Sequence, residues 1–413
     1  MTVSSPDPGG AGRDRLVSLD VIRGVAVMGI LAANLPAFAL PEAAYFSPMA
    51  AGGTAPADIA LWLANLVLVE GRMRGLFSLL FGASMLLVID RARAQGDRPA
   101  ATHMARMAVL FVIGLIHLYL IWWGDILAHY ALCGVIAYPL TRLSPRPLVL
   151  IGIALSLLGM VEMGAGLEML VASAARDTPQ AVATWNSFAV AFGIPPAADL
   201  AQEIAAHRAG YLARVAWRWH HAMGPLEALW LIGPQTLGTM LIGMAAYRTG
   251  FLTGGWPRAR YRRWAIACLA LSLGGYAWLG VETIRHGFAL PWVYAGSMVV
   301  SQPLRVIGTI GYAALVILLL RPGGALTARI AAAGRVAFTN YLGTSIMMTC
   351  VFGWGLGQYA MWSRAALYLL APLAWAVMLA WSAPWLARFR YGPFEWLWRS
   401  LSRAAWQPLR RLH

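Results

Sequence analysis

Long apolar runs that return along the whole sequence limit this chain to few kinds of fold. Hydrophobic residues make up 60% of the 413 positions and charged residues only 12%, and the mean hydropathy is +0.63. A soluble domain carries about 25% charged residues. Runs of about 20 apolar residues cross a bilayer as helices, because a helix satisfies its own backbone hydrogen bonds there. The sequence therefore predicts an all-α integral membrane protein with a polytopic helical bundle.

About ten spans are predicted. The piece at 58–69 is too short to cross and is expected to be interfacial or re-entrant. The run at 291–320 is too long for an upright span and is predicted to break at 302–305, which contains a proline. The spans are expected at 17–40, 75–90, 104–122, 125–141, 147–171, 225–247, 264–284, 291–320, 336–353 and 364–386.

The arginines predict the orientation of these spans. Arginine-rich loops occur at 91–98, 142–146, 248–263, 321–335 and 388–411, on the side of the N-terminus if ten spans exist. The positive-inside rule then places both termini in the cytoplasm and also explains the net charge of +15, so nucleic acid is not an expected partner. The opposite side holds loop 41–57 and the long segment 172–223, which is expected to be a functional lid.

The motif LDVIRG at 19–24 opens the first span. Asp20 and Arg23 are three residues apart, so they share a helical face and can pair. Two interpretations remain open: the pair caps and snorkels at the membrane edge, or it lines a cytoplasmic-side cavity. Asn34 shares the face of Arg23 about 16 Å further along the helix, where an amide facing lipid would be costly.

His117 and Asp125 flank a tight turn that contains Trp122 and Trp123. Antiparallel helices would bring the two side chains together, as a general base and its orienting carboxylate require. The alternative is a helix-hairpin fastening in which Asp125 is a simple N-cap. His129 shares a helical face with Asp125 and is either its orienting partner or a buried polar residue.

Four further charged residues lie within or beside apolar segments. Glu70, Arg72 and Arg74 lie where one segment breaks, and they either line an extracytoplasmic pocket or form an ordinary solvated turn. Arg305 lies deeper, and an arginine inside the membrane indicates a functional site. A phosphate group, as in coenzyme A, is a natural partner for it.

Several function classes are excluded or disfavoured. The sequence has no phosphate-binding Walker loop, no Gly-x-Ser-x-Gly elbow and no dinucleotide-binding fingerprint, which argues against ATP-driven transport and the usual hydrolases. The three cysteines lie in separate apolar runs, and the pair His220 and His221 lacks further ligands, so no metal site is expected.

Five sequence stretches resemble the bacterial membrane proteins with domain of unknown function 418, the YeiB-like family. They are RLVSLDVIRG at 15–24, LFSLLFG at 76–82, His117 with GDIL at 124–127 and YAL at 130–132, GRVAFTNYL at 334–342, and RFRYGPFEWLWR at 388–399. Together they bracket nearly the whole chain. The resemblance implies a location in the bacterial cytoplasmic (inner) membrane.

The opening motif followed by an Asn is also similar to transmembrane acyltransferases, including the lysosomal heparan-glucosaminide acetyltransferase. Those proteins move an acyl group from cytosolic acyl-CoA to a sugar on the far side, with a catalytic His in their first extracytoplasmic loop. Loop 41–57 contains no His. The resemblance divides the chain into a disordered tail at 1–14, an acyltransferase-like half at 15–171, the lid at 172–223, a second membrane half at 224–405 and a cytoplasmic tail at 406–413.

The resulting hypothesis is acyl transfer from cytoplasmic acyl-CoA to an external hydroxylated acceptor, with no metal. His117, Asp125 and Asn34 are the expected catalytic residues, and Asp20, Arg23 and Arg305 the expected donor-binding residues. The acceptor-binding residues are expected to be Glu70, Arg72, Arg74, Trp122, Trp123 and His129. Expected partners are membrane lipids and the small acceptor, with self-association left open. A transporter or efflux component, or a scaffold without chemistry, remains the alternative.

Overall fold

The computed structural model describes residues 8–411, which form helices and connecting loops, without a strand in that range. The α-helices are α1 (Pro8–Ala39), α2 (Pro56–Leu68), α3 (Arg72–Ala94), α4 (Pro99–Ile116), α5 (Leu127–Ala137), α6 (Pro145–Ala174), α7 (Pro179–Phe192), α8 (Ala197–Arg208), α9 (Tyr211–His221), α10 (Pro225–Arg248), α11 (Arg258–Arg285), α12 (Leu290–Tyr294), α13 (Ser301–Leu319), α14 (Ala325–Arg335), α15 (Ala337–Thr349), α16 (Arg364–Tyr368), α17 (Leu370–Arg388) and α18 (Pro393–Ser402). Short 3₁₀ segments are η1 (Glu42–Tyr45) and η3 (Pro139–Arg142), and π-helical turns are η2 (His117–Ile121), η4 (Ala295–Val300) and η5 (Cys350–Trp354).

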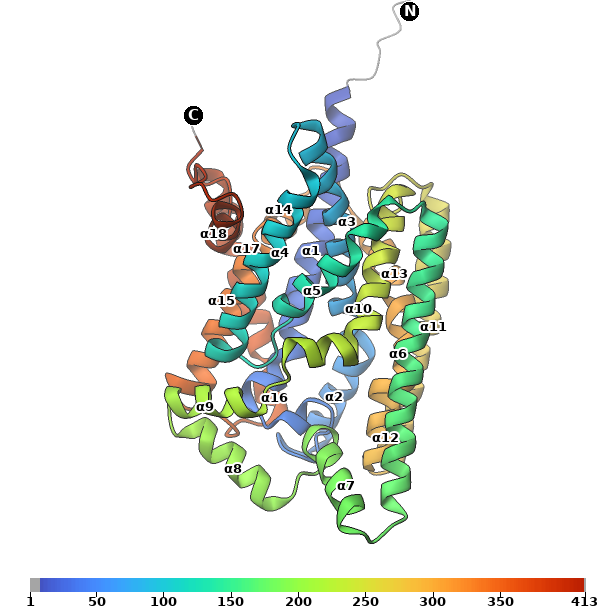
Figure 1. Ribbon diagram of the computed structural model, residues 1–413, viewed down its shortest axis with the longest axis vertical. Coiled ribbons are helices and arrows are strands. Elements are labelled where there is room, and N and C mark those ends of the chain that lie inside the picture. The colour runs from blue at the N-terminus through green and yellow to red at the C-terminus, as the bar shows by residue number, and fades with distance from the viewer. Residues whose placement is uncertain (1–7, 412–413) are drawn as a thin grey trace, which may run out of the picture.

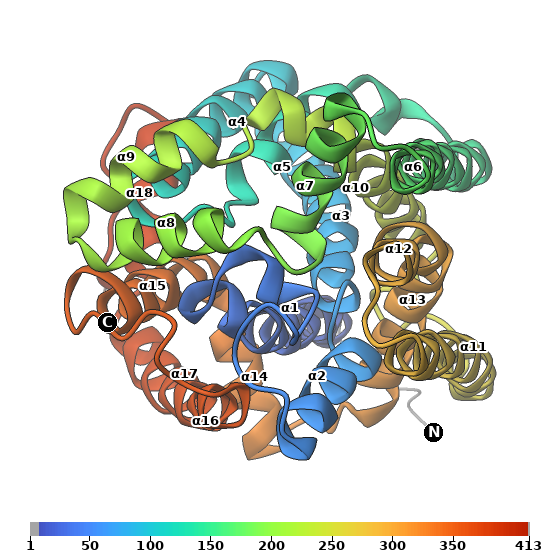
Figure 2. The ribbon, with the colours of Figure 1, turned by 90° about the horizontal axis from the view of Figure 1, so that it is seen from below.

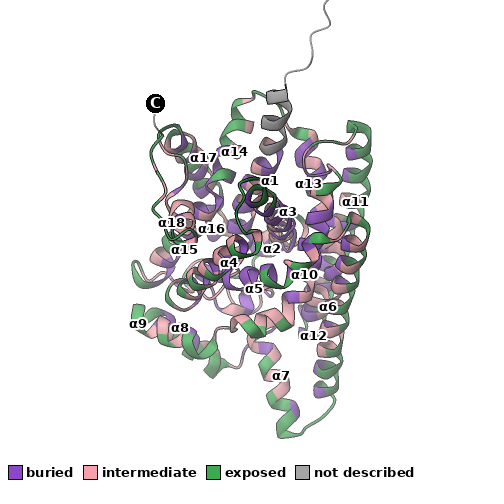
Figure 3. Ribbon diagram, turned by 45° about the horizontal axis from the view of Figure 1, so that its top comes forward, coloured by how far each residue is buried: buried purple, intermediate pink, exposed green. Residues whose placement is uncertain are grey.

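The bundle is arranged around α1, with the lid at one end (Figures 1 and 2). Within an 18-residue apolar stretch of each helix, 72% of α1 is buried inside the protein, but only 28% of α6 and of α11. Helix α1 is therefore central, and α6 and α11 are peripheral. Figure 3 shows the same gradient, with exposed residues gathered on the outer helices. The start of α1 and α18 lie at the end opposite the lid (Figure 1). This placement agrees with both termini on one side of a membrane, and the cytoplasmic assignment stays a prediction.

The protein is a multi-pass membrane protein. In residues 8–411, eight helices are long and apolar enough to span, or nine if the bent pair α14 and α15 counts as one. The predicted count of ten would need α5 to cross as well, and α5 has only 11 residues, which is shorter than the span expected at 125–141. Pro139 begins a 3₁₀ turn directly after it, because proline cannot continue the helical hydrogen-bond ladder.

Two other expectations differ from the structure. The break predicted at 302–305 is wrong: α12, η4 and α13 form one apolar stretch of 30 residues. Pro303 lies in the first turn of α13, directly after a π-helical turn, where its missing N–H costs little. At the N-terminus α1 already begins at Pro8, since proline is tolerated in a first turn, whereas residues 1–7 of the predicted tail lie outside the described residues.

Glycines allow the central helices to approach each other closely. A Cβ at Gly24 would lie 2.2 Å from the backbone carbonyl oxygen of Ile330, and one at Gly334 would lie 1.8 Å from the backbone carbonyl oxygen of Asp20. Helices α1 and α14 therefore meet backbone to backbone. Small residues serve this purpose in membrane bundles. The contact joins the opening motif to the GRVAFTNYL motif, although more than 300 residues separate them.

The predicted lid, 172–223, contains α7, α8 and α9, and two arginines anchor α9. Arg218 Nε donates to the Tyr119 carbonyl of η2 at 2.9 Å, and Arg214 Nη1 donates to the Phe352 carbonyl of η5 at 3.4 Å. Both carbonyls lie in the last turn of a helical segment, where carbonyls have no partner within the helix. The lid therefore holds two π-helical turns in place, and one of them begins with His117.

Candidate functional site

His117 and Asp125 form a buried pair, as the hairpin spacing predicted. His117 Nδ1 lies 2.9 Å from Asp125 Oδ1, and the side chains are 0% and 2% exposed. The other carboxylate oxygen accepts the Ala128 N–H at 2.9 Å, so Asp125 also caps the first turn of α5. Asp125 therefore both caps α5 and pairs with His117, so its side chain fits the structural and the catalytic interpretation.

The second ring nitrogen of His117 distinguishes this pair from a simple fastening. A carboxylate only accepts hydrogen bonds, so Nδ1 carries a proton, and in the neutral ring Nε2 then keeps a free lone pair. Nε2 is buried and has no hydrogen-bond partner in the described structure. Buried polar atoms are nearly always paired, so this one calls for an explanation. A general base has this arrangement before its substrate arrives.

Aromatic side chains position the turn between His117 and Asp125. Trp122 stacks on Phe38 of α1 with ring centroids 4.0 Å apart, and its Nε1 donates to the Ala37 carbonyl at 3.3 Å. Asn34 lies one helical turn before Phe38 on the same face of α1. The structure therefore brings the face of α1 that carries Asn34 against the turn, and half-buried Trp123 lies beside Trp122.

Glu70, Arg72, Arg74 and Arg305 meet where α2 gives way to α3, and are called here the interior arginine cluster. Glu70 is 6% exposed and Arg72 0%, so the solvated-turn interpretation is wrong for both residues. Gly71 between α2 and α3 adopts a positive φ of 73°, which glycine tolerates without steric cost. Arg74 Nη2 donates to Glu70 Oε1 at 3.1 Å, and the Tyr45 hydroxyl donates to the other Glu70 oxygen.

Arg305 belongs to the same cluster, although the hypothesis assigned it to the donor and the other three to the acceptor. Its side chain packs over the backbone of Gly71, where a Cβ would lie 2.8 Å from Arg305 Cδ. Arg305 Nη1 donates to Gln235 Oε1 at 3.2 Å, and Nη2 donates to the Ser297 carbonyl. The stem of Arg72 packs in the same way on Gly308 of α13. The two arginines thus reach across α3 and α13 in opposite directions.

Two tyrosines lie near the cluster and the His–Asp pair. The Tyr130 hydroxyl lies 2.7 Å from the Ser78 hydroxyl and donates to the Arg74 carbonyl at 3.2 Å. Tyr341 packs against the His117 ring with centroids 5.3 Å apart and lies within electrostatic range of Asp125 and Tyr130. Tyr130 therefore bonds to the cluster and Tyr341 packs on the His–Asp pair.

His129 and the opening motif lie apart from this arrangement. His129 Nε2 bonds to the Thr236 hydroxyl at 2.9 Å, which favours the buried-polar interpretation over a role in orienting Asp125. Asp20 and Arg23 form the predicted ion pair at 2.9 Å, with side chains 22% and 26% exposed. A cavity of about 410 Å³ lies beside this motif and is lined in part by Ser18 and Arg258.

The family assignment follows from similarity over the whole chain. The model of the DUF418 family, described as a protein of unknown function, matches residues 246–405. The uncharacterized protein YeiB of Escherichia coli (strain K12) is 31% identical over 404 residues, which cover 96% of this chain and 98% of YeiB. This chain belongs to the DUF418 family. The uncharacterized protein YxaH of Bacillus subtilis (strain 168) is 29% identical over 410 residues, 96% of each chain. No solved structure matches.

For this DUF418 protein the names of these relatives state no activity, so the chemistry rests on the site itself. The roles of Tyr45, Gln235, Tyr130 and Tyr341 were not predictable from the sequence, because single polar residues in mainly apolar surroundings carry no spacing signal. Gly71 and Gly308 were the available hint, since glycine in a helical run often marks a close approach. Within residues 8–411 no group of three or more His, Cys, Asp or Glu side chains is placed to hold a metal ion.

Proposed function

We propose that this protein is a membrane-embedded acyltransferase of the bacterial cytoplasmic membrane. It would transfer an acyl group from cytoplasmic acyl-CoA to an extracytoplasmic hydroxylated acceptor, such as a sugar, a lipid or a small metabolite. The observation that carries the proposal is the buried Nε2 of His117, which has no hydrogen-bond partner while Asp125 holds Nδ1. A histidine oriented in this way is suited to take a proton from a hydroxyl group.

The proposed step balances with the groups named. Nε2 of His117 takes the hydroxyl proton as the acceptor oxygen attacks the thioester carbonyl carbon. Asp125 stabilises the imidazolium that forms, without taking its proton. The carbon–sulfur bond then breaks, and the imidazolium returns the proton to the departing thiolate. The products are an ester and free coenzyme A, and Asn34 is the proposed donor to the carbonyl oxygen as negative charge develops there.

The donor is proposed to enter from the end of the bundle that holds the opening motif. The cavity of about 410 Å³ beside Ser18 offers space, and Arg258 lines it. Arg23, which does not line this cavity and is paired with Asp20, would be a further cation for the phosphates of the donor at the same end of the bundle. Since α1 runs from this motif towards the turn at Trp122, the acyl group would follow α1 into the interior.

A transporter that uses the same polar residues is the second candidate. The break between α14 and α15, which are bent by 75°, favours it, because discontinuous helices near the midplane are common at transporter binding sites. An enzyme forms a new covalent product, whereas a transporter releases its cargo unchanged.

Inside-out vesicles that contain the protein test this difference. Acetyl-CoA labelled in the acetyl group is supplied outside, and a broad extract of hydroxylated metabolites and lipids is enclosed. The proposal predicts label on an enclosed or membrane acceptor, at a level well above vesicles without the protein. Label that never leaves coenzyme A would contradict it and favour the transporter.

A further inference from the structure

The interior arginine cluster contains more positive than negative charge. Arg72, Arg74 and Arg305 contribute three cations, and in the described structure Glu70 is the carboxylate that bonds to the cluster. Arg72 is 0% exposed and Arg305 7%. Buried charges are costly unless a counter-charge or a full set of hydrogen bonds compensates them. Intramolecular contacts alone leave this group of cations under-compensated.

Several donors of the cluster have no acceptor. Nε and Nη1 of Arg72 and Nε of Arg305 are buried without a hydrogen-bond partner, and so is the hydroxyl of Tyr276. The Arg72 guanidinium carbon lies 3.9 Å from the centroid of the Tyr276 ring. A guanidinium donates and never accepts, so what is missing is an acceptor. Carboxylates and phosphates supply several acceptor oxygens together with the missing negative charge.

The glycines beside the arginines keep these donors uncovered. A Cβ at Gly71 would lie 2.9 Å from Arg305 Nε, and a Cβ at Gly308 would lie 2.6 Å from Arg72 Cδ. Any larger residue at either position would displace the arginine side chain. The sequence thus places the smallest residue where the two arginine side chains need room.

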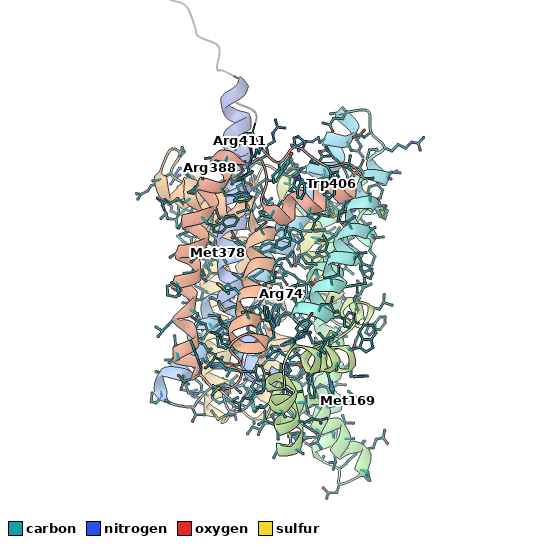
Figure 4. The ribbon with its side chains drawn as sticks, turned by 90° about the vertical axis from the view of Figure 1, so that its left-hand side faces the viewer. Arg74, Met169, Met378, Arg388, Trp406 and Arg411 are labelled. Atoms are coloured by element: carbon teal, nitrogen blue, oxygen red, sulfur yellow. The ribbon has the colours of Figure 1, made fainter. Side chains whose placement is uncertain are left out.

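Arg74 shows that the cluster can be reached. Its side chain is 38% exposed, yet it lies at mid-height of the bundle (Figure 4). Surface at that depth faces either lipid or a space inside the protein, and an arginine facing lipid there is strongly disfavoured. The exposed part of Arg74 therefore faces an interior space, next to the buried donors of the cluster.

We propose that Arg74, which bonds to Glu70, and Arg305, which packs over the neighbouring Gly71, form one binding site for an anionic group, either a carboxylate or a phosphate. The inference rests on the proposed function for its purpose, in that the anion would anchor a reactant near the His–Asp pair. Tyr130 and Ser78 extend the polar interior beyond the cluster, because their hydroxyls bond to each other and Tyr130 also bonds to the Arg74 carbonyl. The anion belongs either to the acceptor or to the phosphates of the acyl donor.

Binding to the purified full-length protein in detergent tests the site without any acyl transfer. Thermal unfolding is followed with inorganic phosphate, acetate or coenzyme A, against chloride at the same ionic strength. We expect phosphate or acetate to raise Tm, since a ligand that binds only the folded state stabilises it. Arg305→Gln and Arg74→Gln should each weaken the apparent affinity about tenfold or more. Arg93→Gln, an exposed arginine paired with Asp90, is the matched control and should not.

The coenzyme A experiment identifies the source of the anion. If Arg305→Gln removes stabilisation by coenzyme A as well as by phosphate, the donor occupies the cluster. If coenzyme A still stabilises Arg305→Gln but no longer stabilises Arg23→Gln, the cluster serves an anionic acceptor. Should Arg305→Gln fail to fold, Arg74→Gln decides, because its head group is partly exposed. The inference is overturned if neither phosphate nor acetate raises Tm above the chloride reference, or if both variants keep the wild-type shift.

Discussion

Two polar clusters of this protein differ in whether their hydrogen-bond donors have acceptors. The first, called here the C-terminal clamp, is Glu395 of α18 with Phe338 and Thr339 of α15. One Glu395 oxygen accepts the N–H groups of Phe338 and Thr339 at 2.8 and 3.1 Å, and the other accepts the Thr339 hydroxyl. The second is the interior arginine cluster, where three arginine nitrogens have no acceptor. A satisfied cluster holds the chain together, whereas an unsatisfied one is arranged for a ligand.

The clamp has an evident structural task. α14 and α15 meet at an angle of 75°, and the first N–H groups of α15 have no helical partners of their own. Glu395 supplies the missing acceptors from a distant part of the chain, and a negative charge at a helix N-terminus is also favourable. The interior arginine cluster has no comparable structural role, because three of its arginine nitrogens have no hydrogen-bond acceptor in the described structure.

The largest effect on stability is therefore expected at the clamp. Glu395→Ala removes the acceptor of three donors, and we expect it to lower the free energy of unfolding by about 3 kcal/mol. Arg305→Gln removes a charge that is not fully compensated, so its cost should be much smaller. Thermal unfolding of both variants in the same detergent measures the difference.

Glu395→Gln provides the control, since its amide oxygen still accepts the backbone N–H groups. It should lose less stability than Glu395→Ala, and the folded fraction of both variants should keep the normal rate of acyl transfer. The distinction between the clusters fails if Arg305→Gln destabilises the protein more than Glu395→Ala.

The lid provides an intermediate case, in which a satisfied cluster contains a carboxyl group that titrates. Glu203 of α8 accepts the backbone N–H of Glu42 at 3.0 Å and the Tyr359 hydroxyl at 2.7 Å. Burial and then the nearby charge of Glu203 raise the pKa of the Glu42 carboxyl from 4.5 to about 7. The docked lid thus holds this proton more tightly than the undocked lid does.

A smaller and pH-dependent effect follows for the docking of α8. Because its pKa is raised in the docked form, the Glu42 carboxyl favours docking most below pH 4.5, less as the pH rises towards about 7 and no longer above it. His207 of α8 acts in the opposite direction below pH 6.5, since burial lowers its pKa from 6.5 to about 3, so the contribution of Glu42 is isolated by comparison with Glu42→Gln. Between about pH 5 and about pH 8 we expect the ratio of α8 protection factors in the unchanged protein to those in Glu42→Gln to fall about tenfold or more, as measured by hydrogen exchange.

Asp199→Asn serves as the control for this measurement, because Asp199 is an exposed carboxylate on α8 itself. It should keep the wild-type dependence on pH. If the ratio of protection factors between the unchanged protein and Glu42→Gln is the same at both pH values, Glu42 does not govern the docking of the lid.

Local sequence rules predicted the parts of the site that depend on nearby residues. The three-residue spacing gave the Asp20–Arg23 pair, and the tight turn gave the His117–Asp125 pair, both of which the structure contains. The apolar runs predicted the helical membrane bundle, which the structure and the family assignment confirm.

Contacts between distant segments were beyond such rules. Arg305 lies beside Arg72 although 232 positions of sequence lie between them, and the contact depends on how α3 and α13 pack at Gly71 and Gly308. The π-helical turn η4 was missed for a related reason. It lies directly ahead of α13, and no residue within it signals a change of hydrogen-bond register.

The rate of acyl transfer in His117→Ala tests the central claim most directly. The single-turnover rate with labelled acetyl-CoA should fall about 10²- to 10⁴-fold, while binding of coenzyme A stays near the wild-type level, because a general base acts on the chemical step. Asp125→Asn should fall as well, since it no longer fixes the tautomer of His117. His221→Ala, which removes a histidine exposed on the lid, should transfer at the normal rate. A His117→Ala protein that folds and transfers label as fast as His221→Ala would contradict the account.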